Sequence, residues 1–290
     1  MNEHYGVEPN AFESASDLHL LLNHFGPYCG RFVAELPSSW REQVRRHIER
    51  LPVVEAARAK RRLQLAEQCR SLVPLTKGVQ QETQDDWLQL FQAAKRQESE
   101  LRGPIVARSR NDGYQTVETL DLPLTAEERI PGTVDQYRRV CATLVRINPE
   151  LNLVDPYLDL CKEWHACVVR SLLKLAISSG NCLFLRMWAL LPKQSNVTAL
   201  QAALDAIVRA VGRPRNGVKL FLLTDGRRDK MHKRYIFGIH GGNELEYGFQ
   251  HFRDGRPVWV SPMPKAKVTE MLSCFVYRKN DYVLEDTFTG

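Results

Sequence analysis

The feature that most limits the possible folds of this chain is a regular alternation of helical and strand patterns in its C-terminal half. Apolar runs of strand length alternate with helical periodicity in the order strand 151–155, helix 158–177, strand 182–190, helix 197–211 and strand 218–223. Each helix must return the chain in the same direction, so the alternation predicts parallel strands with helices on both faces. Ligand sites of such sheets gather at strand ends.

The alternation stops after Leu223, where two strand patterns follow each other closely. Residues 232–238 and 244–249 are joined by His240-Gly-Gly-Asn243, and this spacing predicts an antiparallel hairpin. A final helix is expected over 265–277, after Met263-Pro264. Ahead of the alternation, Thr133 and Gln136 have the spacing of a helix cap and predict a helix that runs to Asn148.

The N-terminal segment 17–101 has helical periodicity and few β-branched runs, so we predict that it is all-α. Ser39 and Glu42 have capping-box spacing and predict a helix that begins near Trp40. Two further helices are expected over 53–71 and 85–102.

Gly, Pro and Asn-Asp-Gly between 103 and 115 favour an exposed connection. The resulting prediction is an α/β chain with three parts: an all-α domain at 1–102, which docks partners, a linker at 103–115, and a mainly parallel α/β domain at 116–290 with a terminal hairpin.

Composition indicates a soluble cytoplasmic protein. No apolar run approaches the roughly 20 residues of a membrane-spanning helix, and residues 1–12 lack the pattern of a secretory signal. The seven cysteines form an odd set without a CxxC pair, as in reduced core residues. Cys161, His165 and Cys167 suggest a metal site, but a buried structural role is preferred. No metal and no cofactor are expected.

Positive charge is concentrated in one part of the chain. From position 150 onward there are 20 Lys and Arg against 14 Asp and Glu, whereas the preceding part has 20 of each. A cluster at 213–234 combines eight basic residues with two acids: Arg213, Arg215, Lys219, Arg227, Arg228, Lys230, Lys233 and Arg234. This density favours binding to a phosphate backbone without sequence preference; a solvated loop is the alternative.

The basic cluster ends in the motif Met231-His-Lys-Arg-Tyr-Ile-Phe-Gly-Ile-His-Gly-Gly-Asn-Glu-Leu-Glu-Tyr-Gly-Phe249. His232 and Arg234 resemble the H-x-K or H-x-R strand of the phospholipase D-like superfamily. Leu153-Val-Asp-Pro-Tyr157 and 218–225 look like the first and third strands of such domains. The resemblance covers about residues 116–290. It implies a histidine nucleophile, a cation that grips the phosphate and a second histidine that protonates the leaving group.

Two positions depart from the superfamily pattern. Arg234 stands where Lys is usual, and Ile239 stands where an Asp normally follows. Only one convincing strand motif is present, so catalysis through His232 and Arg234 requires a homodimer; His251 and Arg253 repeat the spacing outside such a strand. Asp155 and Asp159 offer carboxylates for a metal, but the structural interpretation is that Asp155-Pro156 ends a strand and begins a helix.

Three functions follow from these residues. The preferred hypothesis is a non-catalytic nucleic-acid-binding subunit with a degenerate phospholipase D-like domain, which resembles those of bacterial mobile-element or phage-defence systems and works with other protein subunits. The second hypothesis is a metal-independent phosphodiesterase or nuclease that acts as a homodimer through His232. The third hypothesis is a protein- or membrane-interaction module.

Overall fold

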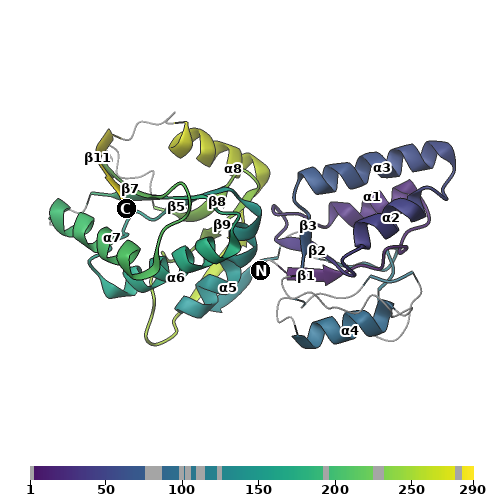
Figure 1. Cartoon of the computed structure of the whole chain (residues 1–290), viewed down its shortest axis with the longest axis horizontal. Coiled ribbons are helices and arrows are strands. Elements are labelled where there is room, and N and C mark those ends of the chain that lie inside the picture. Colours follow the sequence, from purple (N-terminus) through teal and green to yellow (C-terminus); the bar gives the residue numbers. More distant parts are fainter. Residues whose placement is uncertain are drawn as a thin grey trace. The chain divides into compact units, whose positions relative to one another are not determined.

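The computed structural model describes residues 3–75, 87–97, 101, 106–108, 115–122, 126–191, 196–224, 232–277 and 283–290. Within these residues the chain forms two compact units, Asn2–Ala126 and Glu127–Gly290. Both units combine helices with strands, so the chain is mixed α/β (Figure 1). No helix in the described ranges has the length and apolar character needed to cross a bilayer.

The N-terminal unit is not all-α, because it is built around a small parallel sheet. The strands are β1 (Glu3–Gly6), β2 (Arg31–Glu35) and β3 (Leu72–Pro74), and they lie side by side in the order β1-β2-β3. The helices are α1 (Ala15–Asn23), α2 (Trp40–Ile48), α3 (Val53–Gln68) and α4 (Trp87–Gln97). The expectation of a purely helical domain is therefore wrong.

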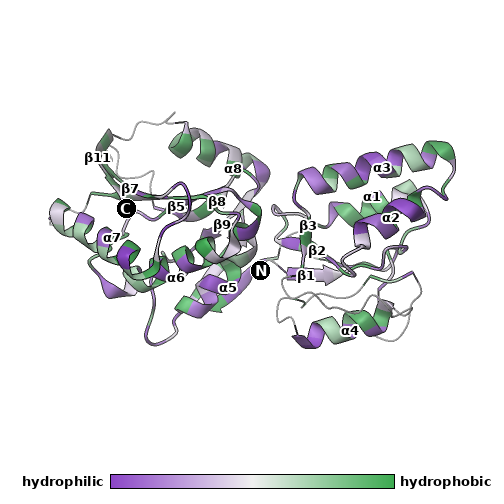
Figure 2. Cartoon of the chain, in the orientation of Figure 1, coloured by the Kyte–Doolittle hydropathy of each residue, from purple (hydrophilic) through white to green (hydrophobic). Residues whose placement is uncertain are grey.

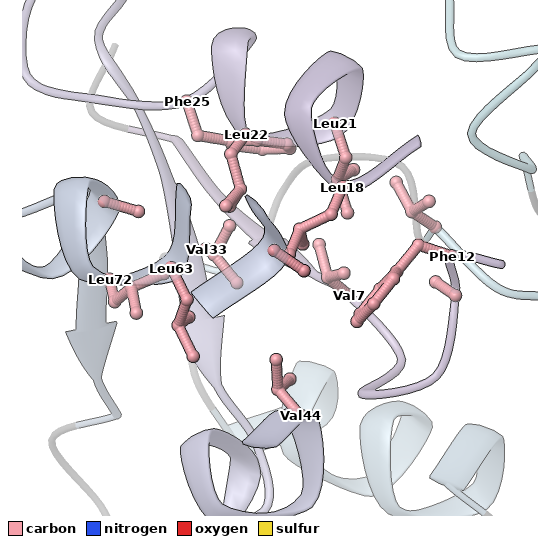
Figure 3. Close-up of a cluster of buried hydrophobic side chains, with 14 of the residues drawn as sticks. Val7, Phe12, Leu18, Leu21, Leu22, Phe25, Val33, Val44, Leu63 and Leu72 are labelled. Atoms are coloured by element: carbon pink, nitrogen blue, oxygen red, sulfur yellow. The ribbon is translucent and has the colours of Figure 1, made fainter. Parts of the chain in front are cut away.

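The helical prediction failed because the three strands are short and the central one is buried on both faces. Val33 of β2 belongs to a core shared with α1, α2 and α3, whereas the next residue, Ala34, belongs to a second core shared with α4. Figure 3 shows the first core, in which Val33 lies among side chains such as Leu18 and Leu63. A strand covered on both sides has no apolar–polar alternation, so short apolar runs were assigned to the surrounding helical pattern.

Helices α2 and α3 of the N-terminal unit start where the sequence predicts, but the predicted cap of α2 differs. Helix α2 begins at Trp40, yet the Ser39 side chain makes no capping hydrogen bond and instead accepts one from the Gln43 side chain at 3.0 Å. The capping box predicted at Ser39 is therefore wrong. A complete capping box is present at α1, where Ser14 and Asp17 bond each other's backbone N–H groups.

The described part of 103–115 belongs to the N-terminal unit. Val106 is buried, and its amide donates to the carbonyl of Gly6 at 2.9 Å. The amide of Ala107 donates to the carbonyl of Gln115 at 2.9 Å. The division that the structure shows comes after Ala126 rather than within 103–115.

The C-terminal unit contains one eight-stranded sheet in the order β11-β7-β6-β5-β8-β9-β10-β4. The strands are β4 (Glu128–Pro131), β5 (Glu150–Val154), β6 (Phe184–Leu190), β7 (Val218–Thr224), β8 (Arg234–Gly238), β9 (Gly241–Leu245), β10 (Pro257–Pro262) and β11 (Val283–Thr289). The βαβαβ prediction is confirmed, because β5, β6 and β7 are parallel neighbours. All other pairs are antiparallel, so the prediction of a mainly parallel sheet is wrong.

The antiparallel strands extend the parallel centre on both sides. The predicted hairpin is confirmed as β8–β9, but its turn is Ile239-His240, because Gly238 pairs with Gly241. Residues 241–243, expected in the turn, belong to β9, which ends at Leu245 instead of running over 244–249. The hairpin adds to the edge of β5, and β10 and β4 continue outward from it. Strands β4, β10 and β11 were not expected; β4 and β11 are the edge strands of the sheet, and β10 lies between β9 and β4. Short strands of mixed polarity give a weak apolar signal.

Helices cover the two faces of this sheet unequally. They are α5 (Val134–Ile147), α6 (Glu163–Ser179), α7 (Val197–Val211) and α8 (Lys265–Met271), the last continued by the π-helical turn η1 (Leu272–Val276). Figure 1 shows α5, α6 and α7 on one face and α8 on the other. On the α8 face, Phe275 packs against Trp188 of β6 and Phe237 of β8, with ring centres 5.5 and 6.4 Å apart.

The parallel sheet of the N-terminal unit can be tested with a matched pair of proline substitutions. Val33 lies in the central strand and its amide donates to the carbonyl of Ser71 at 2.9 Å, so Val33→Pro should destabilise the unit by about 3 kcal/mol or more. Val53 is 87% exposed at the first position of α3, where proline is tolerated, so Val53→Pro should change stability by less than about 1 kcal/mol. Urea unfolding followed by tryptophan fluorescence measures both, and equal stability of the two variants would contradict the sheet.

Candidate functional site

Arg234, the predicted phosphate-binding cation, is held by contacts within its own unit. It opens β8 at the end of the sheet where β5 finishes, because Val154 pairs with Tyr235 in antiparallel register. Its Nη1 donates to the carbonyl of Glu246 at 3.1 Å, and its guanidinium lies 5.0 Å from the centre of the Tyr157 ring. Nε lies 4.0 Å from Oδ1 of Asp155. Arg234 therefore links the start of β8 to the end of β5 and to the segment after β9.

Asp155 is the buried acceptor at the centre of this arrangement. Its Oδ2 accepts from the amide of Phe249 at 2.9 Å and its Oδ1 from the amide of Tyr157 at 3.0 Å. A Cβ atom on Gly248 would lie 2.0 Å from Oδ2, so only glycine lets the backbone approach the carboxylate this closely. Asp155 therefore ties the end of β5 to the segment that follows β9. The predicted strand end is confirmed, but the helix expected from 158 begins only at Glu163.

The residues considered as metal ligands do not converge. Asp159 accepts from the amide of Cys161 at 3.0 Å, while Cys161 is exposed and Cys167 bonds the carbonyl of Trp164. Within the described ranges, no group of three His, Cys, Asp or Glu side chains is placed to hold a metal ion. The carboxylates of Asp155 and Asp159 instead bond nearby backbone amides.

His165 lies buried at the start of α6, close to the Asp155 carboxylate. Its Nδ1 accepts from the amide of Asp159 at 3.1 Å. Burial lowers the pKa of His165, and the negative charge of Asp155 opposes this shift only in part. A neutral imidazole at this place fills a structural position as a hydrogen-bond acceptor. The sequence contained no signal for this contact beyond the six-residue separation of the two partners.

His232 and Lys233 are exposed at the entrance of β8. Lys233 pairs with Glu244 through an Nζ–Oε1 distance of 2.6 Å. The two residues line a cleft of about 300 Å³ together with Arg234, Glu244, Leu245, Glu246, Trp259 and Ser261. His232 is the one histidine among these lining residues, so within the described part of one chain no second imidazole faces the cleft. The two-histidine chemistry implied by the resemblance is incomplete in one copy.

The basic cluster 213–234 is divided between two ends of the sheet. Arg213 and Arg215 are exposed in the loop before β7, whereas Lys233 and Arg234 lie level with its C-terminal end, on the other side of β5. A strand of seven residues spans about 20 Å, so these pairs cannot grip one phosphate. Arg227, Arg228 and Lys230 lie outside the described residues.

Three arginines gather where α7 ends. Arg209 is exposed in the last turn of α7, and Arg213 and Arg215 follow in the loop. Nη1 of Arg213 donates to the carbonyl of Gly290 at 3.5 Å. Among the described residues, no carboxylate side chain lies within ion-pairing distance of any of the three. The group is called the α7 arginine cluster below.

A second basic segment lies on α2 and α3 of the N-terminal unit. Arg41, Arg45 and Arg58 pair with Glu35, Glu67 and Glu55. Lys60, Arg61 and Arg62 are exposed on α3, whose ribbon alternates between hydrophilic and hydrophobic residues in Figure 2. Three of these six charges are therefore neutralised by neighbouring carboxylates, as in an ordinary solvated helix face.

Comparison with known proteins adds little to this geometry. No protein-family model matches the chain, and no curated protein matches it in sequence. Among solved structures, the chain is similar to TrmBL2, an archaeal chromatin protein described as having a novel mode of DNA binding. The match has a TM-score of 0.30 and 10% identity and covers 84% of this chain and 69% of that one. A score this low does not establish a shared fold.

The Asp155 contact can be tested by adding a methyl group to Gly248. The new Cβ would overlap the buried carboxylate and break its bonds to backbone amides, so Gly248→Ala should destabilise the C-terminal unit by about 3 kcal/mol or more. Gly255 has a left-handed φ of +64° with open space around its Cβ position, so Gly255→Ala should cost only about 1 kcal/mol. Urea unfolding of both variants measures the difference, and an equal loss would show that Asp155 does not require the close approach.

Proposed function

We propose that the C-terminal unit binds the phosphate backbone of nucleic acid without cleaving it. The observation that carries the proposal is the α7 arginine cluster, Arg209, Arg213 and Arg215. All three side chains are exposed and have no carboxylate partner among the described residues. Guanidinium groups are suited to phosphate because they offer several fixed donors and keep their charge at any physiological pH.

Electrostatics favours a polyanion as the partner of this cluster. The chain has a formal net charge of +6, and the excess of basic residues lies in the C-terminal half. Arginines in a short loop and helix end can release counterions from a nucleic-acid backbone, which gives affinity that falls with salt and has no sequence preference. Backbone binding is therefore the function these residues support.

The proposal that the unit does not cleave its ligand rests on the contacts that Lys233 and Arg234 make. Arg234 is engaged by Asp155, Tyr157 and the carbonyl of Glu246, and Lys233 is paired with Glu244. Both cations line the His232 cleft, but each is already paired with an acceptor of the same unit. We interpret the motif as a degenerate form of the phospholipase D-like strand. Membership of a mobile-element or phage-defence complex, with other protein subunits, is proposed from the sequence resemblance alone.

Backbone binding can be tested by reversing two charges of the α7 arginine cluster. The double variant Arg213→Glu, Arg215→Glu should bind labelled DNA at least about tenfold more weakly at low salt, and the slope of log affinity against log salt should fall by about 2. Filter binding across a salt series measures both.

The matched control is Lys265→Glu, which makes the same type of charge reversal at the start of α8 on the other face of the sheet. It should change the affinity far less than the double variant. If both proteins bound DNA equally well, the cluster would not be the contact surface.

A second function, metal-independent phosphodiester cleavage by a homodimer, is favoured by one observation. His232 is exposed in a cleft that also contains the half-exposed indole of Trp259 and the hydroxyl of Ser261. An exposed imidazole can act as nucleophile or proton carrier near neutral pH. A partner copy would have to supply the second histidine.

Incubation of the protein with labelled single- and double-stranded DNA and RNA in EDTA separates the two functions. Under the proposed function, wild-type protein and His232→Ala should both retain nucleic acid and leave it intact. Cleavage that disappears in His232→Ala but persists in His19→Ala would overturn the non-catalytic proposal. Light scattering of the same samples would then show whether the active species is a dimer.

A further inference from the structure

A second and larger cavity lies at the same end of the sheet, outside the cleft of His232. Its volume is about 870 Å³, and it is bounded by the first turns of α5 and α6 and by the loop between β9 and β10. The lining residues are Val134, Glu163, Trp164, Cys167, Gln250, His251, Phe252, Arg253, Asp254 and Arg256. None of them belongs to the His232 cleft. The volume falls in the range of small-molecule and cofactor sites.

The loop that forms one wall of this cavity is fastened on both sides. The amide of His251 donates to the carbonyl of Trp164 at 2.8 Å, which ties the loop to α6. The amide of Phe252 donates to the carbonyl of Gly132, and the amide of Gly132 donates to the carbonyl of Arg256, both at 2.8 Å. These bonds connect the loop to the segment before α5. The cavity is therefore preorganised, which lowers the entropic cost of binding.

Two aromatic side chains face this space. Trp164 is 44% exposed in the first turn of α6, where Nζ of Lys162 lies 5.9 Å from the centre of its ring. Phe252 packs closely against Gly132, because a Cβ on Gly132 would lie 2.4 Å from the Phe252 ring. The guanidinium of Arg256 lies 5.2 Å from the centre of the Phe252 ring. Flat apolar faces held this firmly are suited to stacking against a planar ring.

The polar groups of the cavity favour an anion beside the aromatic surface. Arg253 is exposed, and no described carboxylate pairs with it. Arg256 lies 3.9 Å from Asp254 and remains 56% exposed, while Glu163 is neutralised by Arg170. Nδ1 of His251 is buried without a hydrogen-bond partner among the described residues.

Two helix ends add to this polarity. Val134 and Glu163 line the cavity as the first residues of α5 and α6. The residues before them, Thr133 and Lys162, make no side-chain capping bond. The uncapped amides of a helix start carry partial positive charge and bind anions readily. Together with Arg253 they complement a phosphate group.

We propose that this cavity binds one unpaired nucleotide of a single-stranded nucleic acid. The base stacks on Trp164, and the phosphate is held by Arg253 and the amino ends of α5 and α6. A base in a duplex is already stacked and paired, so the cavity selects single strands. This inference rests on the proposed function, in which the α7 arginine cluster binds the backbone of any strand and supplies most of the affinity. The cavity adds the substrate class, which is single-stranded nucleic acid.

The first experiment compares a single-stranded oligothymidylate with a duplex of equal length by fluorescence anisotropy. Trp164→Ala should bind the single strand about tenfold more weakly and the duplex almost as well as wild type, since base–aromatic stacking is lost. Trp164→Phe, which keeps an aromatic face, should recover most of the affinity. Tyr277→Ala removes an aromatic side chain that is 63% exposed at the end of η1, outside both cavities, and should have no effect.

A second measurement separates failure of this inference from failure of the proposed function. Calorimetry with thymidine monophosphate and with inorganic phosphate tests the cavity without a strand, using wild type, Trp164→Ala and Arg253→Glu. Nucleotide binding that is lost in both variants supports the cavity even if wild-type protein binds no oligonucleotide. Oligonucleotide binding that Trp164→Ala leaves unchanged, with no nucleotide binding, overturns the inference and leaves backbone binding intact. Binding of neither ligand overturns both.

Discussion

The buried carboxylate of Asp155 is the interaction on which the C-terminal unit depends. It stands at the end of β5, the strand at which the parallel and antiparallel parts of the sheet meet. By accepting from the amides of Tyr157 and Phe249, it joins the chain that enters α6 to the chain that leaves β9. A buried carboxylate is tolerated only where donors and an opposite charge surround it, and Arg234 supplies that charge.

The same contact organises the surfaces around it. On either side of Phe249, the carbonyls of Gly248 and Gln250 share the single hydroxyl proton of Tyr137. The chain then forms the wall of the larger cavity. A structural bond at the strand end thus leads directly into the loop that presents His251 and Arg253. Fold and candidate binding surface are therefore coupled through one short segment, residues 248–256.

The cations of the C-terminal unit fall into two groups: those that pair with carboxylates of the same unit, and those without a carboxylate partner among the described residues. Lys233 and Arg234 are paired with Glu244 and Asp155 of the same unit. The α7 arginine cluster and Arg253 have no carboxylate partner among the described residues and remain available to solvent anions. Burial and ion pairing therefore distinguish basic residues that look equivalent in the sequence.

The sequence by itself determined the parts of the fold that depend on local periodicity. The helix at 197–211, the parallel series β5, β6 and β7 and the β8–β9 hairpin could be predicted, because apolar spacing and turn residues act within a few positions. Only the tertiary structure decided the parallel sheet of the N-terminal unit and the antiparallel strands β4, β10 and β11. It also decided that Asp155 contacts Phe249 and Arg234. It also placed Arg213 and Arg234 near opposite ends of β7, although both belong to one basic cluster in the sequence. Such positions depend on strand pairing and burial, which involve residues far apart in the sequence.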